Sequence, residues 1–311
     1  MEKFEKNTKI LIVGLGLMGG SYAKALSKGG YAVRAVSREQ EDIDFAVGGG
    51  FLESGSTEPK KELLEWADLV VLALYPHTVI EWVDRYAALL KEGTVVTDVT
   101  GVKGSVVENV QEKMPAGVEF IAAHPMAGRE RSGVVYSDDS VFRGANYIVV
   151  PTARNTEKGI EICEKLGEAL GFYRISRLDV DSHDRMVALL SQLTHCIAVA
   201  LMCACDTPGL ETYTGDSFRD LTRIAKINDE MWSELFLWNK QALLTEMDRF
   251  SWEFAKLRQT LAAGDREKMR EMMRLSKDRR EKFDKPSDRT VLWSEEIKKE
   301  NEPELLKSIS P

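Results

Sequence analysis

The sequence predicts a doubly wound α/β domain followed by an all-helical domain. Between residues 9 and 176, seven short apolar runs rich in β-branched residues alternate with segments of helix length. A glycine-rich turn follows the first of these runs, and from about residue 180 the strand-like runs stop and long helical patterns take over. Strand runs separated by helices indicate βαβ units with a parallel sheet between two layers of helices. We expect domains at 1–177 and 178–284, with a loosely held tail at 285–311.

Length and charge limit the function classes. A chain of 311 residues exceeds the size at which single cores stop growing, about 250–300 residues, so two domains are expected. The net charge of -8 offers no broad basic surface to a nucleic acid. No uninterrupted apolar run reaches the roughly 18 residues of a membrane span, and the N-terminus is charged. We expect a cytoplasmic protein that binds neither nucleic acid nor membrane.

Each strand of the predicted sheet is a short apolar run. A parallel sheet that is covered on both faces needs such runs, because its strands are buried on both sides. The seven runs are KILIVG, YAVRAV, ADLVVLAL, TVVTDV, VEFIAA, NYIVVP and FYRIS.

The second half is predicted to consist of four helical segments, 182–205, 217–238, 239–263 and 265–283. The first of these is apolar almost all round, unlike a helix with one face in water. A domain of about a hundred residues has little else to cover it. We therefore expect this helix to be buried in a homodimer formed through the helical domain.

The first apolar run leads directly into a dinucleotide fingerprint. Gly14, Gly16 and Gly19 have GxGxxG spacing, and Leu17 and Met18 lie at the start of the helix that follows. In this motif the glycines permit a tight turn, the approach of a pyrophosphate and close helix packing. The N–H groups of the first helical turn then face the phosphates. The context of strand, turn and helix predicts a Rossmann-type dinucleotide-binding domain.

The end of the second run indicates which nucleotide is used. Ser37 and Arg38 stand where an NAD enzyme usually carries an acid that binds the ribose 2′-hydroxyl. A hydroxyl and a guanidinium suit a 2′-phosphate better, so we expect NADP. NAD remains the alternative, with an acid between Glu39 and Asp42 serving the ribose.

One of only four histidines stands at the end of a predicted strand. His124 directly follows the run VEFIAA, and ligands in open α/β sheets lie beyond the carboxyl ends of the strands. Histidine exchanges protons near neutral pH. We expect His124 to be catalytic; the alternative is a histidine that merely bonds backbone groups of a Pro/Gly loop.

Five motifs in this order resemble the prephenate and arogenate dehydrogenases of tyrosine biosynthesis. They are GLGLMGGS, DVTGVKG, HPMAGRERSG, SHDRMVALLSQLTH and SFRDLTRIAKINDEMW. The resemblance covers about residues 8 to 283 and implies a dinucleotide-binding domain joined to a helical domain that dimerises. It also implies NAD(P)-dependent oxidative decarboxylation of a cyclohexadienol dicarboxylate, prephenate or alternatively arogenate, to a phenol.

The resemblance also assigns roles to residues. It makes His124 the group that takes the proton of the ring hydroxyl, and Arg223 and His195 the groups that bind substrate. It places Glu130 at a position that helps gate the site. Arg219, Arg223 and Lys226 have the spacing of one basic stripe on a helix, which by itself is usually a solvated face.

Two positions depart from the family pattern. Many members carry a serine at the position of Gly101 that bonds the catalytic histidine, so we expect Thr100 or a water molecule to replace it. The family pattern SHLPH is SQLTH here, which puts Gln192 at a substrate-site position. This change leaves the preference between prephenate and arogenate open.

The sequence leaves two other classes of protein as alternatives. A β-hydroxy-acid dehydrogenase would use a lysine as its main acid or base, and we expect no comparable lysine before the HPMAG motif. A non-enzymatic NADP sensor would have no reason to combine His124 with Arg223. We expect no metal site, because the four cysteines show no CxxC spacing.

Overall fold

The computed structural model describes residues 3–129 and 131–284. The chain divides into two compact units, 1–243 and 244–311, each described by itself below. The predicted tail from residue 285 onward lies outside the described residues. The predicted domain boundary near residue 178 stays a prediction, because the first unit also takes in the helices up to residue 243.

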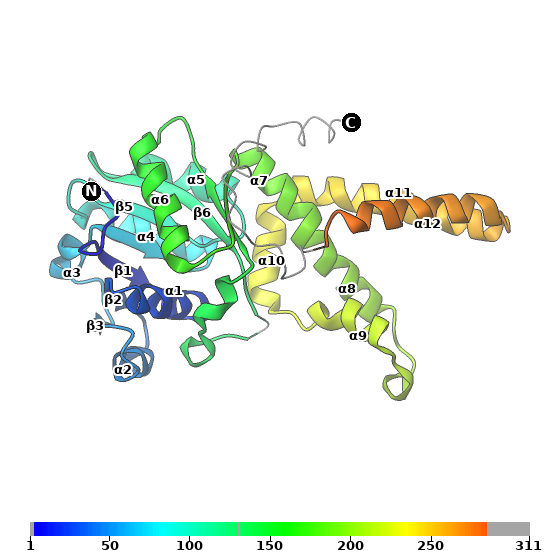
Figure 1. The fold of residues 1–311 in the computed structure, drawn as a ribbon, viewed down its shortest axis with the longest axis horizontal. Helices are drawn as coiled ribbons and strands as arrows, with labels where there is room; N and C mark the ends of the chain where they lie inside the picture. Colours follow the sequence, from blue (N-terminus) through cyan, green and yellow to red (C-terminus); the bar gives the residue numbers. More distant parts are fainter. Residues whose placement is uncertain (1–2, 130, 285–311) are drawn as a thin grey trace. The chain divides into compact units, whose positions relative to one another are not determined.

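An eight-stranded sheet forms the centre of the first unit (Figure 1). Its strands are ordered β3-β2-β1-β4-β5-β6-β7-β8, so the chain reverses its direction of winding between β3 and β4. This reversal is the switch point at which doubly wound sheets bind ligands. The strands are β1 (Lys9–Val13), β2 (Ala32–Val36), β3 (Ser54–Ser56), β4 (Leu69–Leu72), β5 (Val95–Asp98), β6 (Glu119–Met126), β7 (Asn146–Val150) and β8 (Arg174–Arg177).

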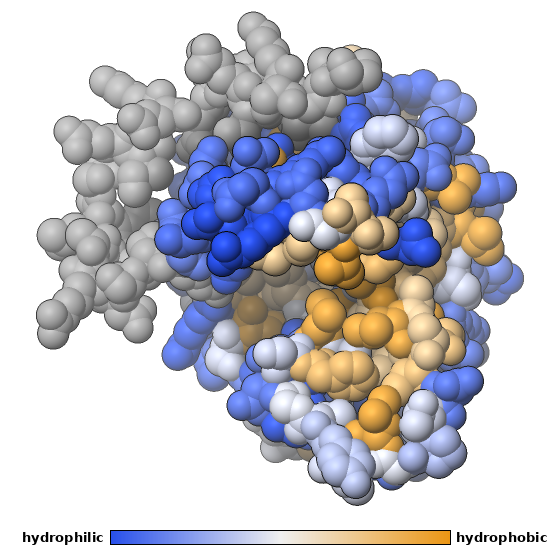
Figure 2. All heavy atoms as spheres, turned by 90° about the vertical axis from the view of Figure 1, so that its right-hand side faces the viewer, coloured by the Kyte–Doolittle hydropathy of each residue, from blue (hydrophilic) through white to orange (hydrophobic). Residues whose placement is uncertain are grey.

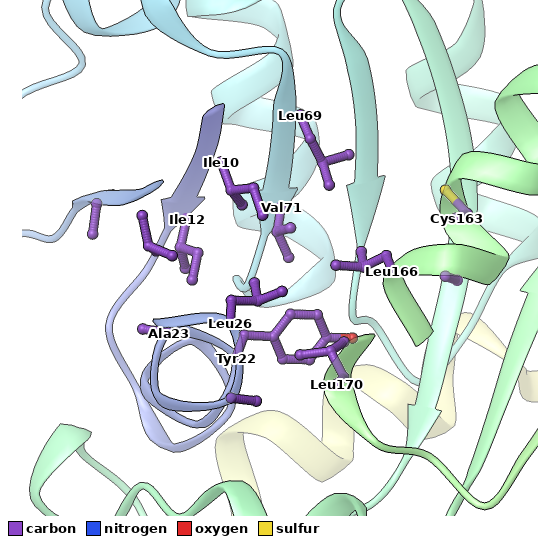
Figure 3. Packing of buried hydrophobic residues seen from close by; sticks show 14 of the residues in the cluster. Ile10, Ile12, Tyr22, Ala23, Leu26, Leu69, Val71, Cys163, Leu166 and Leu170 are labelled. Atoms are coloured by element: carbon purple, nitrogen blue, oxygen red, sulfur yellow. The ribbon is translucent and has the colours of Figure 1, made fainter. Parts of the chain in front are cut away.

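Successive side chains along each strand point to opposite faces of the sheet, and both faces are apolar. In β1, Ile10 and Ile12 enter one core and Leu11 and Val13 the other. Helices α1 (Leu17–Lys28) and α6 (Glu157–Leu170) pack on the first face, where Tyr22 lies among leucines of both helices (Figure 3). Helices α3 (Lys61–Trp66), α4 (Pro76–Tyr86) and α5 (Gly104–Val110) pack on the second. Helix α2 (Gln40–Gly48) follows β2.

Two features of the sheet differ from the prediction of an all-parallel sheet with seven strands. Strand β7 pairs antiparallel with β6, and β8 follows β7 in parallel, so the last two strands run against the others. The reason is the connection from β6 to β7, which contains only the short 3₁₀ turns η3 (Val134–Tyr136) and η4 (Asp139–Phe142) and no crossover helix. Strand β3, with the sequence SGS, is an edge strand without an apolar residue and was not predicted.

The helical part of the first unit starts with one long helix. It consists of α7 (Val180–Val187), a π-helical turn η5 (Ala188–Gln192) and α8 (Leu193–Cys203). The prediction of a single helix over 217–238 was wrong. The chain forms α9 (Asp216–Thr222), a 3₁₀ turn η7 (Arg223–Ala225) and α10 (Asp229–Trp238), and the Asn228 side chain caps α10 by accepting from the N–H of Met231 at 3.0 Å.

The helix 180–203 is apolar, as predicted, but it is not buried within this chain. Only 28% of its most apolar window is buried, and Leu189, Leu190 and Met202 are exposed. By length and composition alone this helix could cross a membrane, a test that the core helix of a soluble protein also passes. Polar residues interrupt it, so the expectation that no uninterrupted apolar run of this length occurs is unaffected, and the expectation of no membrane binding stays a prediction.

The second unit contains most of α11 (Lys240–Ala262) and α12 (Arg266–Glu281). The Asp265 side chain caps α12 by accepting from the N–H of Lys268 at 3.0 Å. Several large apolar side chains of these helices are exposed, among them Trp252 at 72% and Phe254 at 60%. Figure 2 also shows exposed apolar side chains. Exposed apolar surface of this kind marks an interface where it is contiguous.

Candidate active site

The turn after β1 has the shape that a dinucleotide requires. Gly14 has a φ of +97°, and a Cβ there would lie 2.5 Å from the carbonyl oxygen of Ala73. A Cβ at Gly19 would lie 1.9 Å from the carbonyl oxygen of Gly14, so only glycine allows α1 to pack this closely on the turn. At Gly16 a Cβ would meet nothing within 4 Å, which leaves the backbone open to a pyrophosphate.

Helix α1 begins directly beside this open space. Gly16 is its N-cap residue, and no side chain caps the helix. The N–H groups of the first turn, which includes Leu17 and Met18, have no acceptor within a regular helix. Together with the helix dipole they suit the phosphates of a dinucleotide.

The end of β2 holds both predicted ribose-binding residues. Ser37 is buried, and its hydroxyl donates to the carboxylate of Asp42 at 3.2 Å. Arg38 is exposed, and no ion pair of its guanidinium occurs among the described residues. An arginine and an acid therefore both lie close to the ribose position, so the geometry accommodates either the predicted NADP or its alternative NAD.

His124 lies in β6 at the carboxyl edge of the parallel strands. The pairing of β6 with β5 ends at Ile121, three residues earlier, and His124 pairs with Ile148 of β7. Its ring is half-buried. Burial lowers the pKa of His124 well below the usual value, and the positive charge of Lys103 acts in the same direction, as a second proton on His183 would. His124 is therefore neutral at neutral pH and able to accept a proton.

A buried ion pair fixes the backbone just before His124. The ammonium of Lys103 donates to Asp98 and to the carbonyl oxygen of Ala123, both at 2.6 Å. The other carboxylate oxygen of Asp98 accepts from the N–H of Ala123 at 3.1 Å. Both backbone groups of Ala123 are thus held by one pair whose side chains are fully buried.

A buried lysine, Lys103, precedes the HPMAG motif and was not singled out from the sequence. Burial lowers its pKa, and Asp98 opposes that effect. Its ammonium already contacts Asp98, Ala123 and Thr100. These contacts position the strand that carries His124 and leave no donor pointing to a substrate among the contacts of Lys103 in the described structure.

His183 contacts the ring of His124 and was not predicted from the sequence. The Nε2 atom of His183, on α7, lies 2.9 Å from Nδ1 of His124. The Nδ1 atom of His183 lies 2.7 Å from the carboxylate of Asp184, which also accepts the backbone N–H groups of Lys103 at 2.9 Å and Gly104 at 2.8 Å. A histidine followed by an acid in the quoted motif SHDRM, in a chain with four histidines, was the available signal.

Thr100 does not take the place of the family serine. Its hydroxyl is buried between the carboxylate of Asp98, the carbonyl of Val102 and the ammonium of Lys103. A Cβ at Gly101 would lie 3.9 Å from Nε2 of His124, so a serine there would be within reach of the ring. The structure thus leaves Nε2 facing Gly101, and His183 binds the opposite nitrogen.

Helix α10 lies beside Gly101 and also contacts the second predicted histidine, His195 of α8. Leu235 of α10 lies beside Gly101, and Trp232, one turn earlier on the same face, stacks on His195 with ring centroids 3.7 Å apart. The Nδ1 atom of His195 donates to the carbonyl oxygen of Ser191 at 2.8 Å. A carbonyl only accepts, so the unprotonated nitrogen of neutral His195 is Nε2.

The π-helical turn explains how one long helix presents two histidines. His183 and His195 are twelve residues apart, which in a regular α-helix rotates the face by about 120° at about 100° per residue. One extra residue in the π-turn η5 reduces this rotation to about 20°. The turn lies between the two histidines and so places them on nearly the same face.

Arg223 is not part of a regular basic stripe. It starts the 3₁₀ turn η7, which packs against α8, the helix that carries His195. Arg219 instead donates to Asp216 at 2.6 Å within α9. Lys226 follows η7 outside regular helix. The predicted stripe is therefore broken, and Arg223 lies on the turn that packs against the helix of His195.

Gln192 has an internal role in the structure. It is buried, its amide nitrogen donates to the carbonyl oxygen of Leu235 at 2.8 Å, and its oxygen accepts from Asn239 at 2.8 Å. Both ends of the amide thus join η5 to α10, and the expected substrate contact of Gln192 stays a prediction. The predicted Glu130 lies outside the described residues, and neighbouring Arg129 pairs with Asp138 at 2.7 Å.

Comparison with known proteins identifies the family. Residues 22–173 match the family model "Prephenate dehydrogenase, nucleotide-binding domain", and residues 179–275 match "Prephenate dehydrogenase, dimerization domain". The prephenate dehydrogenase of Lactococcus lactis is 30% identical over 252 residues, which cover 78% of this chain and 68% of that protein. The chain belongs to the prephenate dehydrogenase family.

Solved structures of this oxidoreductase family share the fold. Prephenate dehydrogenase from A. aeolicus, solved in complex with hydroxyphenyl propionate and NAD+, has a TM-score of 0.82 and 30% identity over 91% of this chain and 100% of that one. Arogenate dehydrogenase from Synechocystis has a TM-score of 0.77 and 25% identity over 89% of this chain and 100% of that one. The prediction of a nucleotide-binding domain followed by a helical dimerisation domain is confirmed.

The described residues contain no group of three or more His, Cys, Asp or Glu side chains that could hold a metal ion. The titratable groups around His124 in a prephenate dehydrogenase-type fold are instead paired with one another: Asp98 with Lys103, and His183 with Asp184. This arrangement supports proton transfer and substrate binding by side chains of the chain itself.

Proposed function

We propose that this protein catalyses the NAD(P)-dependent oxidative decarboxylation of prephenate to 4-hydroxyphenylpyruvate. The proposal rests on the position of His124 at the carboxyl edge of the sheet, in a chain that belongs to this family. Its Nε2 atom faces Gly101 at the carboxyl edge of the sheet, and its other nitrogen is held by His183. The same edge carries the glycine turn at the switch point of the sheet.

His124 acts as the general base. The O–H bond of the ring hydroxyl breaks as its proton joins Nε2 of His124. The carbon that bears this hydroxyl loses a hydride at the same time. The bound nucleotide supplies the chemistry of hydride acceptance at its nicotinamide. Loss of the ring carboxylate as CO2 then leaves an aromatic ring, so the chain needs no strong general acid.

Arg223 and His195 hold the substrate. Prephenate carries two carboxylates, and a guanidinium binds a carboxylate through two parallel hydrogen bonds. Arg223 lies on the turn that packs against α8, and His195 projects from α8 against Trp232. Glu130 and Thr100 remain proposed as members of the site, Glu130 as its gate and Thr100 through its contacts with Asp98 and Lys103.

The proposed cofactor preference is NADP. The nucleotide would be held by Gly14, Gly16 and Gly19 and by the first turn of α1 at Leu17 and Met18, with Ser37 and Arg38 at the 2′-phosphate. The exposed guanidinium of Arg38 at the end of β2 supports this preference. Asp42, bonded to Ser37, is the residue that would serve NAD instead.

We also propose a cytoplasmic homodimer that forms through the helical domain, residues 178–284, and binds neither nucleic acid nor membrane. Exposed Leu189, Leu190 and Met202 of the long helix would then face a second copy rather than lipid. Burial against a partner explains why a helix this apolar is mostly uncovered in one chain.

The test is a turnover assay with two substrates and two nucleotides. Prephenate and arogenate are each supplied with NADP and with NAD, and the absorbance of the reduced nicotinamide is followed. We expect the highest kcat/KM with prephenate and NADP. No reduction with either substrate would refute the proposed function. Faster turnover of arogenate would favour the alternative, which the similarity to the Synechocystis arogenate dehydrogenase supports.

A further inference from the structure

We propose that Asp184 and His183 form a relay that keeps the proton of neutral His124 on Nδ1 and so reserves Nε2 for the substrate hydroxyl. The proposal deepens the proposed function, on which its catalytic part rests. It assigns His183 and Asp184 as positioning residues, since each acts through His124. The relay itself is a property of the free protein and is measurable without substrate.

The argument starts at Asp184. Burial alone would raise its pKa, but the hydrogen bonds from His183 and from two backbone N–H groups hold the pKa below its usual value. Asp184 is therefore ionised at neutral pH and can only accept hydrogen bonds. The ring nitrogen of His183 that lies 2.7 Å away, Nδ1, must carry a proton.

The second step follows from the charge of His183. Burial lowers the pKa of His183 below its usual value, although Asp184 opposes this effect, so the ring is neutral at neutral pH. A neutral ring with its proton on Nδ1 has an unprotonated Nε2, which accepts a hydrogen bond. Nδ1 of His124, 2.9 Å away, must then be the donor. Nε2 of His124 is left as the basic nitrogen.

The relay also affects how well His124 takes up a second proton. When Nε2 accepts the substrate proton, the resulting imidazolium donates from Nδ1 to a ring polarised by the charge of Asp184. The other groups described near His124 include the ion pair of Asp98 with Lys103 on the β5–α5 side, Leu235 of α10 beside Gly101, and Ile148, its pairing partner in β7. Asp184 is the negative charge that reaches His124 through the ring of His183.

The wild-type protein provides the first test. In a ¹⁵N spectrum of the free protein labelled on histidine, we expect the His124 signals to show a protonated Nδ1 and an unprotonated Nε2 near neutral pH. His124→Asn identifies these signals by their loss. A proton on Nε2 of His124 would overturn the relay, whether or not the protein turns over prephenate.

Two variants of His183 provide the second test. His183→Gln keeps an acceptor near the Nε2 position but loses the link to Asp184, and His183→Phe loses both. In both variants we expect the pKa of His124, followed by the same spectrum, to fall, and the acid limb of kcat/KM to move to lower pH. We expect kcat to fall about tenfold or more in His183→Phe, because a mis-set histidine tautomer costs a serine protease about 10⁴-fold. Nucleotide affinity should be unchanged.

Asp179→Asn is the matched control. Asp179 is the N-cap residue of the same helix, and its side chain accepts from the N–H of Ser182 at 2.8 Å, a capping role that asparagine retains without changing the backbone. An unchanged pKa of His124 in His183→Gln, or a shift of equal size in Asp179→Asn, would overturn the proposal. If His183→Phe does not fold, His183→Gln and the wild-type spectrum still decide. If the spectra are as expected but the protein does not turn over either substrate, the proposed function is refuted and the relay still holds.

Discussion

The Nδ1 atom of His124 lies 2.9 Å from the Nε2 atom of His183, so a single hydrogen bond joins the edge of the sheet to the first long helix of the helical half. The two residues are 59 positions apart in the chain. Behind them, Asp184 binds the backbone of Lys103 and Gly104 and thereby attaches the start of α7 to the start of α5. The predictions below depend on this packing.

Replacing His124 by asparagine should retain nucleotide binding and remove most turnover. A general base typically contributes about 10²–10⁴-fold, and asparagine cannot take the proton. Steady-state kinetics and a nucleotide titration measure the two effects. Near-normal kcat in His124→Asn would exclude His124 from the mechanism.

The pH profile of the wild type follows from the lowered pKa of His124. The base must be neutral to act, and burial holds its pKa well below the usual value of 6.5. Activity should therefore persist as the pH falls through 6.5 and decline only at lower pH. An acid limb of kcat/KM centred above pH 6.5 would contradict this assignment.

Arg223→Ala should raise the KM for prephenate and leave nucleotide affinity unchanged. It removes a carboxylate contact that is made in both the ground state and the transition state. Arg219→Ala is the control, because Arg219 is four residues earlier and pairs with Asp216 on the surface. Equal effects of the two substitutions on KM would show that Arg223 is also a surface residue.

Arg38→Ala should reduce the preference for NADP over NAD, mainly through the KM for NADP. Loss of one charge-assisted contact costs roughly 1.5–3 kcal/mol, about ten- to a hundredfold in affinity. Arg34→Ala on the same strand is the control, since Arg34 lies over Trp66 and beside Glu53. A wild type that prefers NAD would refute the prediction and point to Asp42.

Lys103→Met should destabilise the protein by about 3–5 kcal/mol, because it leaves the buried carboxylate of Asp98 unpaired. Lys91→Met removes a pair with Asp68 of the same 2.6 Å N–O distance but with both side chains partly exposed, and should cost about 0–1 kcal/mol. Urea unfolding of both variants measures the difference. Similar losses of stability would show that the Asp98–Lys103 pair is not specially buried.

The protein should sediment as a dimer at micromolar concentration, and serine at Trp252 and Phe254 together should weaken that dimer. Both side chains are largely exposed on α11 and belong to the dimerization-domain match. Tyr173→Ser, at an exposed aromatic of the nucleotide-binding domain, should leave the dimer intact. A wild-type monomer would refute the prediction.

Much of the nucleotide-binding domain could be predicted from the sequence because its signals are local. The apolar runs, the spacing of Gly14, Gly16 and Gly19, and the position of His124 after a strand each depend on a few neighbouring residues. The spacing of apolar residues and the residue types of turns encode such features directly. The direction of β7 was not predictable in this way, because the absence of a crossover helix between β6 and β7 had to be seen in the fold.

The sequence by itself determined the residue types of the site, and only the tertiary structure decided which of them act together. His183 was present in a quoted motif, but its bond to His124 depends on how α7 packs against the β5–α5 connection. The π-turn that brings His183 and His195 to nearly one face adds a residue within an unbroken apolar helix, which no periodicity reveals. Gln192 and Thr100 looked equally available, yet burial engaged their polar atoms in internal hydrogen bonds. A buried polar group must find a partner, and long-range packing selects that partner.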